Sequence, residues 1–398
     1  MSLRCCYVFI FLTPLLINPV FAAGTWSGNV ALEYRYFTKN ALDNRQHGDN
    51  WSFSAQPEYF RRWDGERQSF TFVPFLRIDE NDPERSHFDI RELTWVKANK
   101  SHEWRIGIRK VYWGVTESQH LVDIINQTDL VENIDTEDKL GQPMVNLSLV
   151  RDWGTLDFFV LPGFRERTFP GVKGRLRSQP RVDTDQAVYE SSSEQRHVDV
   201  AMRWSHSIGN WDIGLSYFSG TSRDPRFVPG VDSSGAPVLV PYYDQMRQTS
   251  LDLQWTIGNW LWKLEAIARQ SNGVSYNASV TGFEYTFTGI FKSKKDLGVL
   301  LEYHHDSRGT RATTPFQDDI FIGFRLSFND RQSTELLFGS VRDRDNSAES
   351  FFLETSRRFG SHWKGSLEIR SFRNAPPTDL LFMFRNEDVL QLELAYYF

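Results

Sequence analysis

The chain closes with Leu390-Gln391-Leu392-Glu393-Leu394-Ala395-Tyr396-Tyr397-Phe398, in which large apolar residues occupy every second position. Successive side chains of a strand point to opposite faces, so this period of two places the leucines on one face and the polar residues on the other. One face could contact lipid and the other water. The alternative is an amphipathic strand that closes a soluble β-sandwich.

The same alternation recurs along the whole chain, beginning with Trp26, Val30, Leu32 and Tyr34. Counting these runs predicts eighteen strands, an even number that returns both ends to one side. The predicted connections alternate between short turns and longer loops at 38–49, 80–86, 112–142, 163–194, 221–244, 271–276, 307–316, 343–349 and 374–386. We therefore expect an all-β, antiparallel transmembrane β-barrel with short periplasmic turns and long extracellular loops. Sixteen strands is the alternative if 87–111 or 143–162 is misread. Segment 87–98 changes parity, which indicates a bulge.

The first 22 residues have the pattern of a secretory signal peptide, with Arg4 before an apolar stretch and small residues at Ala22 and Ala23. We expect a barrel domain over 24–398. Both cysteines, Cys5 and Cys6, lie in the leader, so no cysteine-based site remains. The formal net charge of −6 makes nucleic acid an improbable partner. No other stretch is apolar for long enough to form a membrane-spanning helix.

The terminal strand closely resembles the last strand of Gram-negative outer-membrane β-barrels, whose final Phe belongs to the signal read during insertion. A second resemblance lies in Gly107-Ile108-Arg109, Trp113-Gly114, Asn126 and Asp129. This segment is similar to poorly characterised porin-like families and, loosely, to alginate-export-type barrels. The resemblance implies an integral outer-membrane location and an insertion role for Phe398. It also implies contact with membrane lipid, lipopolysaccharide and the barrel assembly machinery.

Charged residues on the polar parity of the strands are expected to face the lumen, because a charge facing lipid at mid-depth costs ~2–4 kcal/mol. As wall residues they would pair laterally, and as a set they would line a charged channel. The pore-lining candidates are Arg35, Arg77, Arg105, Arg109, Arg203, Lys263, Glu265 and Arg325.

The loop 112–142 is strongly acidic, and its candidates for a constriction are Asp123, Asp129, Glu132 and Asp135. By analogy with the loop at the same ordinal position in general porins, it would fold inward and oppose Arg105 and Arg109. Such opposed charges sort ions. The alternatives are a solvated surface loop or a calcium-binding loop. The next loop carries six basic residues within 163–181, for which pairing with the acidic loop is the first choice, before lipopolysaccharide or anionic solutes.

The predicted function is porin-like passive diffusion of small hydrophilic solutes, including anionic to zwitterionic ones. An export conduit for a polysaccharide or other polymer is the alternative. A surface hydrolase is weaker, because Ser205 with His206, and His304 and His305 near Ser307, lie in no motif, and adjacent positions point to opposite faces. We expect no cofactor and no bound metal. Homo-oligomerisation stays open.

Overall fold

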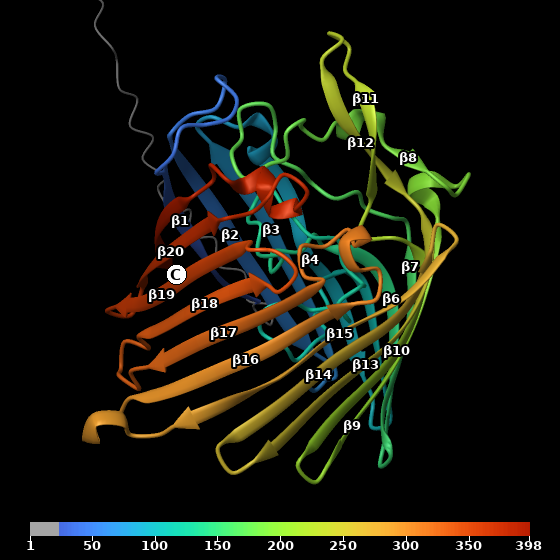
Figure 1. Cartoon of the computed structure of the whole chain (residues 1–398). Helices are drawn as coiled ribbons and strands as arrows, with labels where there is room; N and C mark the ends of the chain where they lie inside the picture. The colour runs from blue at the N-terminus through green and yellow to red at the C-terminus, as the bar shows by residue number, and fades with distance from the viewer. Residues whose placement is uncertain (1–23) are drawn as a thin grey trace, which may run out of the picture.

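The computed structural model describes residues 24–398, in which the terminal strand β21 (Val389–Tyr397) pairs antiparallel with β1 (Thr25–Phe37). This pairing covers Asn29 to Phe37 and closes the sheet into a barrel (Figure 1). The terminal Phe398 adds two backbone hydrogen bonds with Gly28, of 3.1 and 3.2 Å. Closure satisfies the backbone groups that an open edge would leave unpaired.

Eighteen antiparallel strands form the barrel, so the predicted count is confirmed and the alternative of sixteen is wrong. Each strand pairs with its neighbours along the wall. Between β1 and β21 the strands are β2 (Asp49–Trp63), β3 (Gln68–Asp79), β4 (His87–Ala98), β5 (His102–Arg109), β6 (Gln142–Arg151), β7 (Gly154–Pro162), β9 (Val198–Ile208), β10 (Trp211–Thr221), β13 (Gln245–Ile257), β14 (Trp260–Ser271), β15 (Val274–Phe287), β16 (Asp296–Asp306), β17 (Asp318–Ser327), β18 (Glu335–Asp343), β19 (Glu349–Phe359) and β20 (Trp363–Arg373).

The alternation of the sequence becomes the two faces of this wall. On β1, Leu32 and Tyr36 are each 48% exposed on the outside, whereas Glu33 and Arg35 between them are buried on the inside. On β10 and β13 the outward Trp211 and Trp255 stack with ring centroids 5.1 Å apart. The helical segments of residues 24–398 are short 3-10 turns, and none is long and apolar enough to cross a membrane.

The parity change in segment 87–98 is a bulge, as expected. The register between β3 and β4 shifts at Val73 and Pro74, which face Glu92 and Ile90, so that Arg91 is the extra residue. The bulge leaves Phe88 and Trp95 on the outer face and buries the side chain of Arg91 inside the barrel.

The long loops contain a second sheet that the sequence did not predict. Strand β12 (Pro237–Tyr243) pairs antiparallel with β11 (Arg226–Val231) and parallel with the two-residue β8 (Val188–Tyr189). This small sheet rises above the long-loop end of the barrel in Figure 1. The signal-peptide prediction lies outside the described residues.

The orientation of the wall can be tested with single cysteines, because the chain has no cysteine after position 6. In bilayers, cysteines at Gln254 and Glu354 should react with a small water-soluble thiol reagent, whereas cysteines at the neighbouring Leu253 and Leu353 should not. In a membrane-inserted barrel the inward pair would face water and the outward pair would face acyl chains. Equal labelling of both pairs would refute this register.

Candidate functional site

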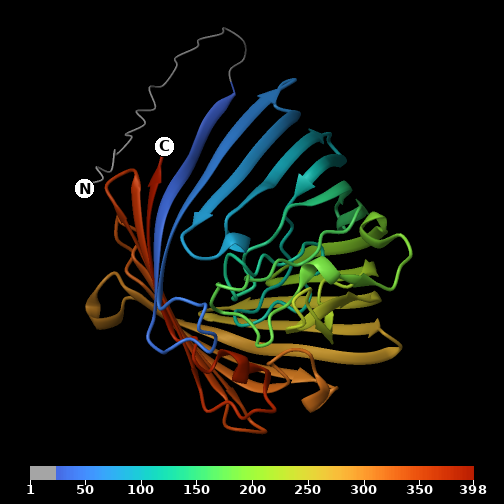
Figure 2. The same ribbon diagram turned by 90° about the horizontal axis from the view of Figure 1, so that it is seen from above.

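The segment between β5 and β6, residues 110–141, lies inside the barrel and crosses it. In Figure 2, the view from above, it passes through the space that the strands enclose. Its side chains and amides contact inward-facing residues of β1, β3, β14, β16, β17 and β20. We call residues 110–141 the inward segment.

Glu265 of β14 is the first anchor of the inward segment. Its carboxylate accepts hydrogen bonds from the backbone amides of Val115 at 2.7 Å, Thr116 at 3.0 Å and Val122 at 3.1 Å. The Thr116 hydroxyl donates a further bond at 2.7 Å. Glu265 is completely buried, so these amides replace the water that an ionised carboxylate requires.

Glu302 of β16 is the second anchor. It accepts the backbone amides of Glu117 at 2.7 Å and Ser118 at 2.9 Å. The Ser118 hydroxyl also contacts Glu302 and lies 2.7 Å from Nε2 of the buried His304. The Ser118 hydroxyl is already bonded to a carboxylate in a buried site, so it holds the segment in place. The geometry therefore gives the Ser118–His304 pair no support as a hydrolytic pair.

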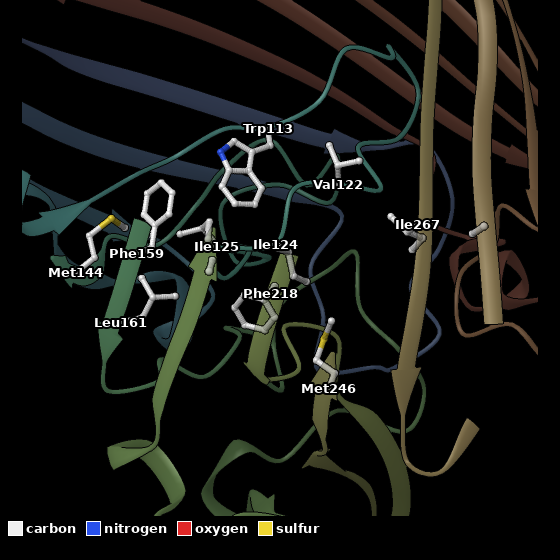
Figure 3. Packing of buried hydrophobic residues seen from close by; sticks show 12 residues of the cluster. Trp113, Val122, Ile124, Ile125, Met144, Phe159, Leu161, Phe218, Met246 and Ile267 are labelled. Atoms are coloured by element: carbon white, nitrogen blue, oxygen red, sulfur yellow. The ribbon is translucent and has the colours of Figure 1, made fainter. Parts of the chain in front are cut away.

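A hydrophobic cluster fills the space between the inward segment and one side of the wall (Figure 3). Trp113, Val122, Ile124 and Ile125 of the segment pack against inward side chains of the strands. Those wall residues are Met144, Phe159, Leu161, Ala201, Phe218, Met246, Ile267 and Ala278. Burial of large apolar side chains contributes ~1.5–3 kcal/mol each, so this side of the lumen is packed like a protein core.

The acidic residues of the inward segment pair with bases other than the expected ones. Asp129 lies 2.7 Å from Arg91, Glu132 2.7 Å from Arg77, Asp135 3.1 Å from Arg370, and Asp123 3.4 Å from Lys139. The prediction that these acids lie opposite Arg105 and Arg109 is therefore wrong. Both arginines donate to Asn146 of the neighbouring strand β6. Arg105 also bonds Ser148 of β6 and pairs with Glu103 of its own strand β5.

The pKa values of Glu132, Asp123 and Asp135 shift in different directions. Burial opposes ionisation of Glu132, but the guanidinium groups of Arg77 and Arg85 hold its pKa below the ordinary value. Burial raises the pKa of Asp123, which Lys139 only partly offsets. Burial also raises the pKa of Asp135, against the influence of Arg370. The direction of each shift thus depends on whether the neighbouring bases outweigh the effect of burial.

His120 completes the tie to β14. Its ring nitrogens lie 3.6 Å from Glu265 and 3.2 Å from Glu137. Burial opposes protonation of the imidazole, but the two carboxylates raise its pKa to about 10. The inward segment therefore carries a positive imidazolium beside its first anchor at neutral pH.

The predicted pore-lining residues fall into two environments. Arg35, Arg77, Lys263 and Glu265 are buried under the inward segment, where they hold it rather than face open space. Arg105, Arg109, Arg203 and Arg325 are only partly buried; Arg203 forms a pair with Asp252 at 2.7 Å, and Arg325 bonds Glu117 at 2.5 Å. A role in solute passage stays a prediction for all eight.

Sequence reasoning missed residues that hold the part of the inward segment around residues 129–132. Arg85, in the loop before β4, donates to the Val131 carbonyl at 2.8 Å and is itself held by Glu33 and Asp79 of the wall, and Arg91 binds Asp129. The bulge that redirects Arg91 was visible as a parity change. Arg370 shares the parity of Glu368 and could have been found from the alternation, but Arg85 gave no signal.

The basic loop 163–181 does not form ion pairs with the acidic segment, so that expectation is wrong. Its arginines bind carboxylates elsewhere, as in the pairs Arg165–Asp89 at 3.0 Å, Arg167–Asp224 at 2.7 Å, Arg175–Glu387 at 2.9 Å and Arg177–Asp43 at 3.0 Å. Hydrogen bonds link the two loops instead: Thr168 donates to Asp129 at 2.6 Å, Arg165 to the Gly141 carbonyl at 2.7 Å, and Arg167 to Gln127 at 3.2 Å. The arginines therefore tie the long loops to one another and to the rim.

The other side of the lumen, along β17 to β20, carries partly exposed charges. Side-chain exposure is 43% for Glu354 and 37% for Arg325. The inward side chains here are only partly buried; they include Arg325, Glu354, Ser356, Lys364, Ser366, Glu368 and Arg370, and Glu284 of β15 lies 3.6 Å from Arg325. We call this face the open side.

Two groups in residues 24–398 bring together metal-ligating residue types, namely His87 with Asp129 and Glu132, and Asp135 with Glu354 and Glu368. In the first, Arg91 and Arg77 already neutralise the carboxylates. In the second, all three carboxylates surround the guanidinium of Arg370. An arginine occupies the position that a cation would take in each group.

No family model matches the chain, and no curated protein matches it. Among solved structures it is similar to a Rhodopseudomonas blastica porin triple mutant, with a TM-score of 0.45, and to another Rh. blastica porin mutant, with 0.46. The TM-score is 0.48 for a solved structure with the description "Asymmetric conductivity of engineered proteins". Each of the three is 12% identical in sequence to this chain. Each alignment covers 94% of this chain and 100% of the other chain. Likeness of this degree says nothing about function, and the resemblance to alginate-export-type barrels stays a prediction.

Replacing Glu265 by alanine should release the tip of the inward segment, because three buried amides lose their acceptor at ~1–3 kcal/mol each. Hydrogen exchange of peptides covering 113–122 should accelerate at least tenfold in the folded barrel. Glu393→Ala, a lumenal change on β21, is the control and should leave these peptides protected. Unchanged protection in Glu265→Ala would contradict the anchor.

The high pKa of His120 predicts a loss of stability at alkaline pH. Because the folded value of about 10 exceeds the ordinary 6.5, protonated His120 contributes stability that is complete below pH 6.5 and is lost as pH rises through 10. The His120 ring resonances should therefore stay unchanged from pH 7 to 9 in a nuclear magnetic resonance titration. Glu137→Gln should shift the titration to lower pH, and a wild-type midpoint near 6.5 would refute the assignment.

Proposed function

We propose that this chain is an outer-membrane channel for passive diffusion of small hydrophilic solutes. The observation that carries the proposal is the division of the lumen: one side is packed by the hydrophobic cluster, and the open side is lined by partly exposed charges. The apolar outer face of the closed wall supports a membrane location. A barrel of this strand number is wide enough for an aqueous path beside an inward segment.

Two ion networks border the open side. In one, Lys263 and Arg325 lie within 4.0 Å of Glu117 and Glu284. In the other, Arg370 contacts Asp135, Glu354 and Glu368. Together they hold five carboxylates against three bases. A narrow, weakly screened path with this excess favours cations and zwitterions over anions, in contrast to the preference expected from the sequence.

The solute class follows from the same geometry. Hydrophilic solutes can replace lost water with contacts to the charged side chains on both borders of the path, so their passage is favoured. Apolar solutes would desolvate these charges without compensation, so their passage is disfavoured. No catalytic step is needed for this function. The insertion role of Phe398 and the contacts with lipopolysaccharide and the assembly machinery belong to the same proposal.

The proposal predicts ion conductance in planar bilayers with a modest preference for potassium over chloride. Glu354→Gln combined with Glu368→Gln should lower the permeability ratio by at least about twofold, because both carboxylates border the path within one Debye length of about 8 Å. Reversal potential across a salt gradient measures this ratio. Glu349→Gln is the control, because it lies on the same strand β19 but pairs with the outward Arg342 at 3.3 Å.

Two results would contradict the proposal. A barrel that inserts but conducts no ions would exclude a diffusion channel. Equal ratios in the wild type, the double variant and the control would remove the open side as the path. Arg105→Gln and Arg109→Gln do not test the proposal. Both arginines pair with β6 and not with the inward segment.

A further inference from the structure

An aromatic cluster covers the outer face of β13 to β15 at the short-turn end of the barrel. Trp260 contacts Phe283 and Tyr285 with ring centroids 5.1 and 4.6 Å apart, and Tyr285 contacts Phe287 at 4.7 Å. Outward aromatic girdles lie at the level of the lipid headgroups. The turn that follows Phe287 therefore begins at the membrane surface.

This turn, residues 288–295 between β15 and β16, differs from the other short turns. It contains Lys292, Lys294 and Lys295 and no acidic residue. None of the three lysines forms an ion pair with any residue in 24–398, although Lys295 lies 4.5 Å from the ring centre of Phe328. The turns 64–67 and 328–334, by comparison, contain acids as well as bases. Three positive charges remain available to a partner.

Phe291 stands at the tip of the turn and is 94% exposed. Its backbone has φ 54° and ψ 31°, and Lys292 has φ 55°. Left-handed backbone is unfavourable for a bulky residue, so neighbouring contacts must hold it there. Asp296 accepts the Gly289 amide at 2.9 Å, and Asn329 donates to the Lys294 carbonyl at 2.7 Å.

The turn projects away from the wall. In both Figure 1 and Figure 2, the orange segment between β15 and β16 extends outside the outline of the strands. An aromatic ring flanked by lysines, beside an aromatic girdle and directed away from the lumen, meets the membrane surface and not the solute path. The chemistry that complements it is a phosphate group above an acyl chain.

We propose that residues 288–295 bind anionic phospholipid in the leaflet on the short-turn side. The lysines contact the headgroup phosphates, and Phe291 enters the boundary between headgroups and acyl chains. This inference rests on the membrane location in the proposed function but not on conduction. Each lysine near an anionic membrane surface adds a favourable electrostatic contribution to binding. The contributions of three lysines together are enough to select anionic over zwitterionic lipid.

The test is retention of lipid by the refolded chain of residues 24–398. Delipidated protein is incubated with equimolar palmitoyl-oleoyl phosphatidylglycerol and phosphatidylcholine, and bound lipid is counted by native mass spectrometry. The wild type should enrich phosphatidylglycerol, and Lys292→Gln/Lys294→Gln/Lys295→Gln should reduce the enrichment at least about fivefold. Phe291→Ser should reduce retention of both lipids.

The matched control is Lys97→Gln/Lys100→Gln/Arg151→Gln, which removes the same charge from residues at and beside other short turns. It should retain the enrichment. Equal loss in both triple variants, or no enrichment in the wild type, would overturn the proposal; so would unchanged enrichment in the first triple variant. Bilayer conductance of that variant should match the wild type. Absent conductance with normal lipid selection would refute the channel and leave the lipid site standing.

Discussion

Closure of the sheet between β1 and β21 is the constraint on which the structure depends. An open strand edge leaves a row of backbone N–H and C=O groups without partners, and closure gives every strand two neighbours. The pairing of the terminal strand with β1 provides this, and it fixes which parity faces outward around the whole wall. The inward parity is then free to carry charge. Every other feature of the lumen follows from that freedom.

The charges inside serve mainly to hold one segment in place. Glu265 and Glu302 are buried carboxylates that each accept backbone amides of the segment, and His120 adds a charged partner for Glu265, so they tolerate little change in the position of the segment. Arg77 and Arg91 hold the root of the segment through Glu132 and Asp129. With its hydrophobic cluster, the segment makes one side of the lumen a packed core. The exposed charges of the open side are the remainder.

The strand pattern was predictable because a period of two acts locally and repeats in every hairpin. The alternation found all eighteen strands and indicated a bulge within segment 87–98. It could not find the partners of the acidic segment, because those contacts join residues far apart in sequence. Asp135 meets Arg370, and Glu117 meets Arg325, across the barrel. Local composition showed that loop 112–142 is acidic, but only the fold decides which base each acid contacts. The small sheet of β8, β11 and β12 was missed because its strands are short and Pro229, Pro237 and Pro241 interrupt them.

The distance in sequence between the anchors and the segment they hold has a consequence for assembly. Val115 lies 150 residues before Glu265, and Ser118 lies 184 residues before Glu302. Loop-closure entropy delays such contacts until the intervening strands have paired. The segment must therefore dock late, into a wall that already contains β14 and β16. Until then the apolar wall residues of the hydrophobic cluster are exposed to water inside a wider lumen, and docking is the step that covers them and narrows the lumen.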